Sequence, residues 1–230
     1  MPHVHAHVPH EVTERHDKPG ADAGRPDRGE RVLEIGAVLL LSLTTLVTAW
    51  SGYQAARWSG EQSQHYARAS TLRIKAQQQS TFAGQFRIDD LVLFNEWLDA
   101  RTAGDTQLAR LYRRRFRPVF EPAFRAWLAQ RPFARRAEVP GPLYMPQYRL
   151  PETAEAAELD RQADFLFREG SDAKASDDRY ILSTVFFAGV LFFAGISLRL
   201  GWRPLRVAVL AMAAVMLFGG IGYVATLPIA

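Results

Sequence analysis

The sequence predicts an all-α integral membrane protein with three transmembrane helices and a helical, coiled-coil-like extramembrane insert between the first and second spans. Three long apolar runs indicate the spans, at residues 32–56, 180–198 and 207–230. A helix rises about 1.5 Å per residue, so about 20 apolar residues cross a hydrocarbon core about 30 Å thick. Apolar residues at alternating steps of three and four indicate long helices in the insert, residues 57–179.

The first span is predicted to be a retained anchor, because the segment before it is too long and too acidic for a cleaved signal peptide. Small side chains recur along it at three- or four-residue steps. Such a stripe lets two helices approach closely in lipid, so it predicts a helix-packing face. The alternative is a polar conduit lined by Ser42, Thr45 and Thr48. The predicted packing residues are Thr45, Ala49, Gly52, Ala56 and Gly60.

The insert is expected to begin and end as two long helices that continue the first and second spans and pair antiparallel as a stalk. In the second of these helices, the predicted seam is Leu159, Ala163, Leu166, Gly170, Ala173, Asp177 and Tyr180. Gly84 is the expected point of a bend or break in the first, because glycine costs about 1 kcal/mol in a helix interior. The predicted seam of the first helix is Ala67, Ser70, Ile74, Gln77, Thr81, Gly84, Ile88, Leu91, Asn95 and Leu98.

Between these helices, turn signals predict a short helical tip. Gly104 should end the outgoing helix, and Asp105 should cap the next one. Residues 131–151 hold five prolines and a glycine, which predicts an irregular loop.

Charges near the membrane predict the orientation. Arg199, Arg203 and Arg206 lie in a linker, residues 199–206, that must share a side with the N-terminal flank. Because basic residues in short loops favour the cytoplasm, we expect a cytoplasmic N-terminus and linker, with residues 57–179 in the periplasm or outside the cell. This corresponds to a multi-pass protein of a bacterial inner membrane.

The leading tail, residues 1–31, is predicted to be disordered and is rich in histidine. Four of its imidazoles, at His3, His5, His7 and His10, are the candidate ligands for Zn, Ni or Cu(II). A flexible hydrated tail that binds no metal is the simpler interpretation. Elsewhere the lack of cysteine excludes disulfides, thiolate zinc sites and cysteine nucleophiles.

Two charged groups in the insert are the remaining candidates for chemistry. The acidic residues Asp89, Asp90, Glu96 and Asp99 are expected to form a solvated face paired with arginines rather than a cation site. A basic cluster should pair with the acidic stretch 152–164, the alternative being contact with anionic lipid, a cell-wall polymer or an acidic partner. No phosphate loop, dinucleotide fingerprint or nucleophile elbow occurs, so no enzyme, cofactor or nucleic-acid function is predicted. The basic cluster is Arg113, Arg114, Arg115 and Arg117.

Three motifs resemble a bacterial membrane-protein family of unknown function. They are AWSGYQA followed by WSGEQ at residues 49–62, YRRRFRP at residues 112–118 and FFAGIS at residues 192–197. The resemblance covers nearly all of the chain after Arg31 and implies an inner-membrane protein with three spans. It implies no activity, cofactor or functional residue.

Together these observations predict a non-enzymatic membrane protein that acts as an interaction or assembly module. We expect it to form homo-oligomers through its small-residue faces, with another membrane protein as a second candidate partner. The competing functions are a component of a transporter or channel, and an extracytoplasmic sensor that binds a ligand in the insert.

Overall fold

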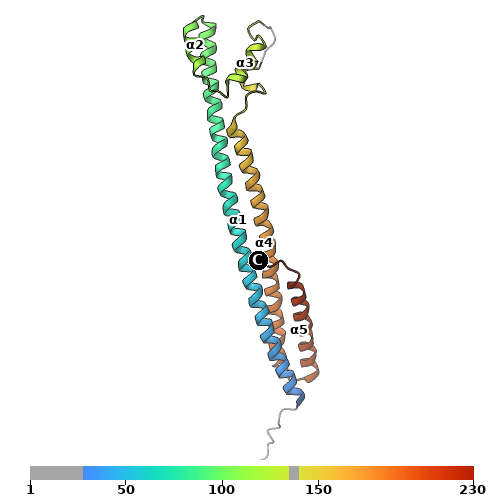
Figure 1. Ribbon diagram of the computed structural model, residues 1–230. Helices are drawn as coiled ribbons and strands as arrows, with labels where there is room; N and C mark the ends of the chain where they lie inside the picture. The colour runs from blue at the N-terminus through green and yellow to red at the C-terminus, as the bar shows by residue number, and fades with distance from the viewer. Residues whose placement is uncertain (1–27, 135–139) are drawn as a thin grey trace, which may run out of the picture.

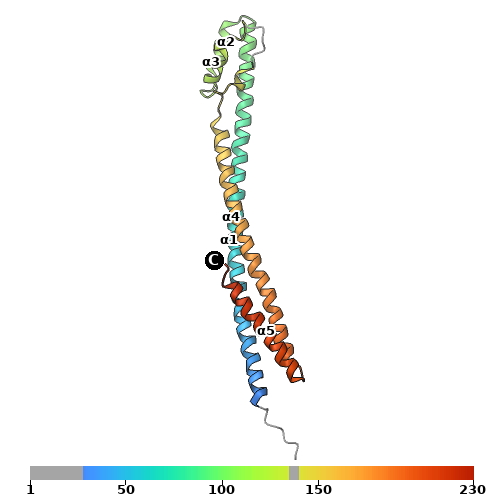
Figure 2. The same ribbon diagram turned by 90° about the vertical axis from the view of Figure 1, so that its right-hand side faces the viewer.

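The protein is an elongated, all-helical rod, as a computed structural model that describes residues 28–134 and 140–230 shows (Figure 1). The two longest helices, α1 (Arg28–Thr102) and α4 (Pro151–Ser197), run side by side in opposite directions in both views (Figure 2). At one end α5 (Arg203–Val224) packs beside them. At the other end lie α2 (Thr106–Arg114), α3 (Glu121–Ala129) and the 3₁₀ turn η1 (Pro142–Tyr144).

Three of these helices, α1, α4 and α5, contain segments long and apolar enough to cross a membrane. The first two continue far beyond the apolar segment without interruption, as the sequence predicts. The third is shorter than expected: α5 ends at Val224, and the remaining residues of the predicted span, 225–230, are not helical. The connection between α4 and α5 is correspondingly short, since Arg203 and Arg206 belong to α5.

The stalk is the part of α1 and α4 between the apolar segments and the far end of the rod. On α4 the buried and half-buried positions include every member of the predicted seam, from Leu159 to Tyr180, which confirms that prediction. On α1 the buried positions recur every seven residues, at Ala69, Ala76 and Ala83. Small side chains therefore face one another across the stalk, and the two backbones can approach closely.

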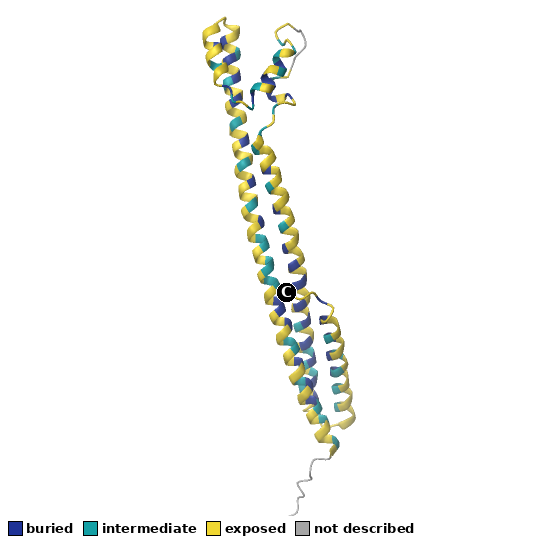
Figure 3. Ribbon diagram, in the orientation of Figure 1, coloured by how far each residue is buried: buried dark blue, intermediate teal, exposed yellow. Residues whose placement is uncertain are grey.

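The predicted seam of α1 is wrong. Ile74 and Ile88, two of its most apolar members, are 68% and 60% exposed, and they lie on the side of α1 opposite the alanines that face α4. Gly84 does not break the helix either, because α1 is continuous from Arg28 to Thr102. Figure 3 shows the narrow buried line of α1 facing α4 and the broad exposed surface behind it.

The two helices of the stalk approach each other closely at Gly170. A Cβ atom built there would lie 2.6 Å from the ring of Tyr66, which stacks on Phe167 with ring centroids 5.1 Å apart. Between α5 and α4, Gly220 permits a similarly close contact, because a Cβ atom there would lie 2.6 Å from the ring of Phe187 on α4. Glycine at these two points allows helices to pack against aromatic rings.

The head, residues 86–134 and 140–150, folds around aromatic side chains at the far end of the rod. Gly104, with φ of +80°, ends the turn after α1, and the Asp105 carboxylate accepts hydrogen bonds from the backbone N–H groups of Gln107 and Leu108. Both residues act as predicted. The loop after Arg131 is less irregular than expected, since η1 forms within it. The buried aromatic residues are Phe94, Trp97, Phe116, Phe120, Phe124 and Trp127.

Candidate functional site

One face of α1 is exposed along almost the whole helix. It begins with all five predicted packing residues, Thr45 to Gly60, which are all exposed. A Cβ atom added at Gly52, Gly60 or Gly84 would meet nothing within 4 Å. We call this surface the outer face of α1. At steps of three and four it comprises Thr45, Ala49, Gly52, Ala56, Gly60, Ser63, Ala67, Ser70, Ile74, Gln77, Thr81, Gly84, Ile88, Leu91, Asn95 and, at its end, Leu98, which is half-buried against the core of the head.

The outer face carries no charged side chain, although charged residues such as Arg68, Lys75 and Asp89 flank it. Beyond the apolar segment it includes Ile74, Ile88 and Leu91, which are among the exposed large hydrophobic residues. A long exposed stripe without charge, in which large apolar side chains recur, is typical of a surface that another protein covers.

Two of the three hydroxyl groups proposed for a conduit, those of Thr45 and Thr48, bond to their own helix. Thr45 Oγ1 donates to the carbonyl oxygen of Leu41 at 2.8 Å, and Thr48 Oγ1 donates to that of Thr44 at 2.7 Å. Such bonds leave a small, weakly polar surface, which suits close helix packing.

Beside the apolar segments, the residues after α5 fold onto α1 and α4. The carbonyl oxygen of Pro228 accepts hydrogen bonds from Trp58 Nε1 and from the Tyr180 hydroxyl, both at 3.1 Å. Buried Gln54 accepts a bond from the backbone N–H of Ala230 at 3.0 Å. We call these five residues the C-terminal clamp. It joins the segment after α5 to α1 and α4 at the base of the stalk.

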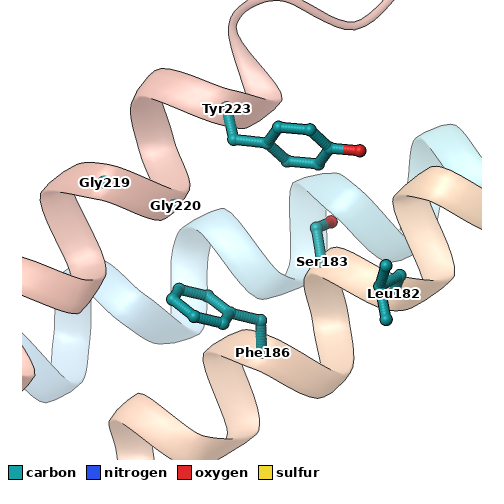
Figure 4. A pocket seen from close by; sticks show the side chains of 6 residues that line it. All are labelled: Leu182, Ser183, Phe186, Gly219, Gly220 and Tyr223. Atoms are coloured by element: carbon teal, nitrogen blue, oxygen red, sulfur yellow. The ribbon is translucent and has the colours of Figure 1, made fainter.

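A small apolar cavity of about 190 Å³ opens between α4 and α5 (Figure 4). Tyr223 and Phe186 form its sides, and Gly219 and Gly220 leave it open toward α5. The Ser183 hydroxyl donates to the carbonyl oxygen of Tyr180 at 2.7 Å, so it offers little to a polar ligand. The cavity therefore suits an apolar group.

One acidic residue of the head, Asp90, is buried and not solvated as the sequence predicts. Asp90 is 0% exposed and occupies the heptad position that follows Ala69, Ala76 and Ala83. Its Oδ2 accepts hydrogen bonds from the Tyr148 hydroxyl at 2.9 Å and from Arg117 at 3.4 Å, while Oδ1 is buried with no partner.

Burial raises the pKa of Asp90, and the nearby Asp89 adds to the rise, whereas Tyr148 and Arg117 oppose it. Burial and the Asp90 carboxylate raise the pKa of Tyr148 in turn. The guanidinium of Arg117 also lies over the Phe86 ring, 3.9 Å from its centroid. The group therefore ties the segments around residues 117 and 148 to α1 at the point where the head begins.

The basic cluster does not pair with residues 152–164 as expected. Arg117 pairs with Asp90, and Arg113 pairs with Glu121 at 3.3 Å. Within the described residues, Arg114 and Arg115 form no ion pair. The acidic stretch uses other partners, since Asp164 pairs with Arg73 at 3.1 Å and Glu158 with Arg161.

The described residues contain no group of three or more His, Asp or Glu side chains that could hold a metal ion. The predicted ligands His3, His5, His7 and His10 lie outside these residues. Metal binding by these four histidines therefore stays a prediction.

Comparison with known proteins identifies no relative. No family model, no curated protein and no solved structure matches this chain.

Proposed function

We propose that this protein is a membrane-anchored assembly module: copies associate through the outer face of α1 and hold their heads at a common height above the bilayer. The observation that carries this proposal is the continuous uncharged face from Thr45 to Leu98, with Ile74 and Ile88 exposed to water. The face is continuous from the apolar segment to the head, so one partner helix of similar length would cover all of it.

A second copy of α1 is the occupant that matches this length. Two copies in one membrane have parallel α1 helices, and a two-fold axis between them brings each residue of the face close to its own counterpart. Small residues in the apolar segment permit close approach in lipid, and Ile74, Ile88 and Leu91 supply apolar contacts outside it. Asn95, at a heptad position of this face, would favour the aligned register.

The orientation in the membrane is part of the proposal. The beginning of α1 and the connection between α4 and α5 lie at the same end of the rod (Figure 1). This end carries Arg28, Arg31, Arg199, Arg203 and Arg206. Basic residues at this end favour the cytoplasm, which would place the stalk and head on the other side of a bacterial inner membrane.

The experiment is a cysteine scan in native membranes, which the cysteine-free sequence makes simple. Single substitutions Gly52→Cys, Ile74→Cys and Ile88→Cys test the face, and Arg68→Cys and Asp89→Cys are exposed controls on its flank. A disulfide requires Cα atoms about 4.4–6.8 Å apart. We expect oxidation to link the first three variants as dimers and to leave the controls monomeric.

Equal crosslinking at the flanking controls would contradict the proposed interface, as would monomers at all positions. Labelling with a water-soluble thiol reagent separates assembly from a conduit. In an assembly Gly52→Cys is protected, whereas in a water-filled conduit it reacts.

A further inference from the structure

The surface of the head contains two adjoining hollows, and Arg110 and Arg113 line both. The larger, about 480 Å³, is lined by Arg110, Arg113 and Arg114 and by one carboxylate, that of Glu121, which pairs with Arg113 and Arg125. The second, about 310 Å³, is lined by Arg110 and Arg113 again, together with Arg101 from the end of α1. Four arginines from α1 and α2 thus line the two hollows, and two of them, Arg110 and Arg113, line both.

Most of this positive charge is not neutralised internally. Within the described residues, Arg101, Arg110 and Arg114 form no ion pair, and only Arg113 has a carboxylate partner, Glu121 at 3.3 Å. Arg110 and Arg114 each donate through Nε to a backbone carbonyl oxygen four residues earlier, which leaves their terminal nitrogen atoms for another acceptor. Guanidinium groups bind phosphate and carboxylate oxygens through paired hydrogen bonds.

The second hollow also has an apolar surface. Trp97 and Ala109 are buried at its base, and Leu128 and Phe133 lie on its side. The Phe133 ring is 58% exposed and meets Trp127 edge to face at 5.8 Å. A planar or apolar group could therefore lie against Phe133 while anionic groups contact the arginines beside it.

The membrane that anchors the protein is too far away to supply the anion. Trp97 lies 40 residues beyond Arg57, where the first apolar segment ends. At 1.5 Å per residue this separation is about 60 Å. Electrostatic attraction is screened within about 8–10 Å at physiological salt, so headgroups of that bilayer exert no pull on the head.

We propose that the paired hollows bind an organic pyrophosphate: two neighbouring phosphate groups held by Arg101, Arg110, Arg113 and Arg114, attached to a planar or apolar group that packs against Phe133. Pyrophosphate esters of nucleosides and of isoprenoid alcohols both carry this chemistry. Arg110 and Arg113 line both hollows, so they can contact two neighbouring phosphate groups at once, and the organic group matches the apolar surface of the second hollow.

The test is isothermal titration of the full-length protein in detergent at low salt with four probes: phosphate, inorganic pyrophosphate, adenosine diphosphate and geranyl diphosphate. We expect pyrophosphate to bind more tightly than phosphate, and one of the two organic probes to bind more tightly than inorganic pyrophosphate. The tighter of these two identifies the source. Absence of binding by all four probes would overturn the proposal.

Matched variants locate the site. Arg101→Gln and Arg110→Gln should each weaken binding of the preferred probe by at least about tenfold, the effect of losing one charge-assisted contact. Arg149→Gln removes an exposed head arginine that lines neither hollow and should change the affinity by less than about twofold. Equal losses in all three variants, or in none, would contradict the assignment.

Phe133→Ala separates the organic subsite from the anionic one. It should reduce affinity for the preferred organic probe and leave that for inorganic pyrophosphate unchanged. A final experiment reconstitutes the protein in its own membrane and then adds separate vesicles rich in phosphatidylglycerol. If such vesicles bind through Arg110 and the soluble probes do not, the site is a lipid-surface contact and the proposal fails.

Discussion

At the scale of single residues, Asp90 is the most unusual group in the protein. It has the position of the stalk alanines but the chemistry of a buried acid, with one carboxylate oxygen unpaired and the other bonded to Tyr148 and Arg117. Because burial raises its pKa, the folded protein favours the protonated form more than the unfolded chain does.

Stability should therefore decrease as the pH rises from the ordinary carboxyl value of about 4 through the raised pKa of Asp90. Asp90→Asn removes this titration and retains an oxygen that can accept the Tyr148 hydrogen bond. We expect the stability of this variant to lack the decrease above about pH 4 that Asp90 causes. At neutral pH the variant should melt at or above the wild-type temperature. Near-ultraviolet circular dichroism of the head tryptophans measures both effects.

Asp90→Ala is the matched comparison. It leaves a small cavity and takes the acceptor from Tyr148 and Arg117, so it should destabilise the head by about 2–3 kcal/mol. If the Asn and Ala variants were equally unstable at neutral pH, the charge on Asp90 would matter more than its burial.

A second prediction concerns Gly170, where helix propensity favours alanine but packing favours glycine. Alanine is favoured over glycine in a helix by about 1 kcal/mol, but a Cβ atom here would lie 2.6 Å from the Tyr66 ring. Gly170→Ala should therefore destabilise the stalk by about 1–3 kcal/mol. The control is Gly84→Ala in dilute, monomeric protein, where the added Cβ meets nothing, and stability should rise by about 0.5–1 kcal/mol. A stabilised Gly170→Ala would contradict the close contact.

At the scale of elements, the helices and their ends follow directly from the sequence. Pro151, Gly104 and Asp105 mark helix boundaries through local backbone chemistry, so they can be read without the fold. The seam of α4 could be read equally well, because Leu159 and Leu166 are the most apolar residues of its only continuous stripe.

The seam of α1 could not be predicted, because this helix has two opposite heptad stripes. Ile74, Ile88 and Leu91 make the outer stripe more apolar than the inner one, which is built from Ala69, Ala76 and Ala83. Which stripe meets α4 depends on the fit between helices, and small residues on both sides give the closer approach. The Asp90 contacts were missed for a related reason, since Arg117 and Tyr148 are distant in sequence and only the fold brings them together.

The C-terminal clamp gives a prediction at the same scale. The double variant Trp58→Phe and Tyr180→Phe removes both donors to Pro228 but keeps the aromatic packing. We expect a spin label at Ile229→Cys to become more mobile, while the control Trp202→Phe, in the connection between α4 and α5, leaves its spectrum unchanged. Unchanged mobility in the double variant would show that packing alone holds the segment.

At the scale of the whole molecule, the stalk sets the distance between head and membrane through its seven-residue repeat. Arg73 pairs with Asp164, and Tyr66 lies against Gly170, so residues 69–82 of α1 run alongside about residues 155–168 of α4. Deleting both 14-residue segments preserves the buried pattern. The variant should fold, with a stalk shorter by about 21 Å as measured by spin–spin distances between the head and residue 58.

Deleting ten residues from each helix, 69–78 and 159–168, is the control. Ten residues do not complete whole repeats, so the remaining inner positions of α1 turn away from α4 and the pair should melt at a much lower temperature. Equal stability of the two deletions would mean that the repeat does not determine pairing.

Because α1 is one uninterrupted helix from its apolar segment to the head, a tilt of the apolar end displaces the head by an amount that grows along the rod. Membrane helices commonly tilt by about 20°, and a change of only about 10° would swing the head sideways by about 10 Å over an arm of about 60 Å. The protein is thus built as a lever, and a thinner bilayer or a neighbour pressing on its base would register as a displacement at its tip.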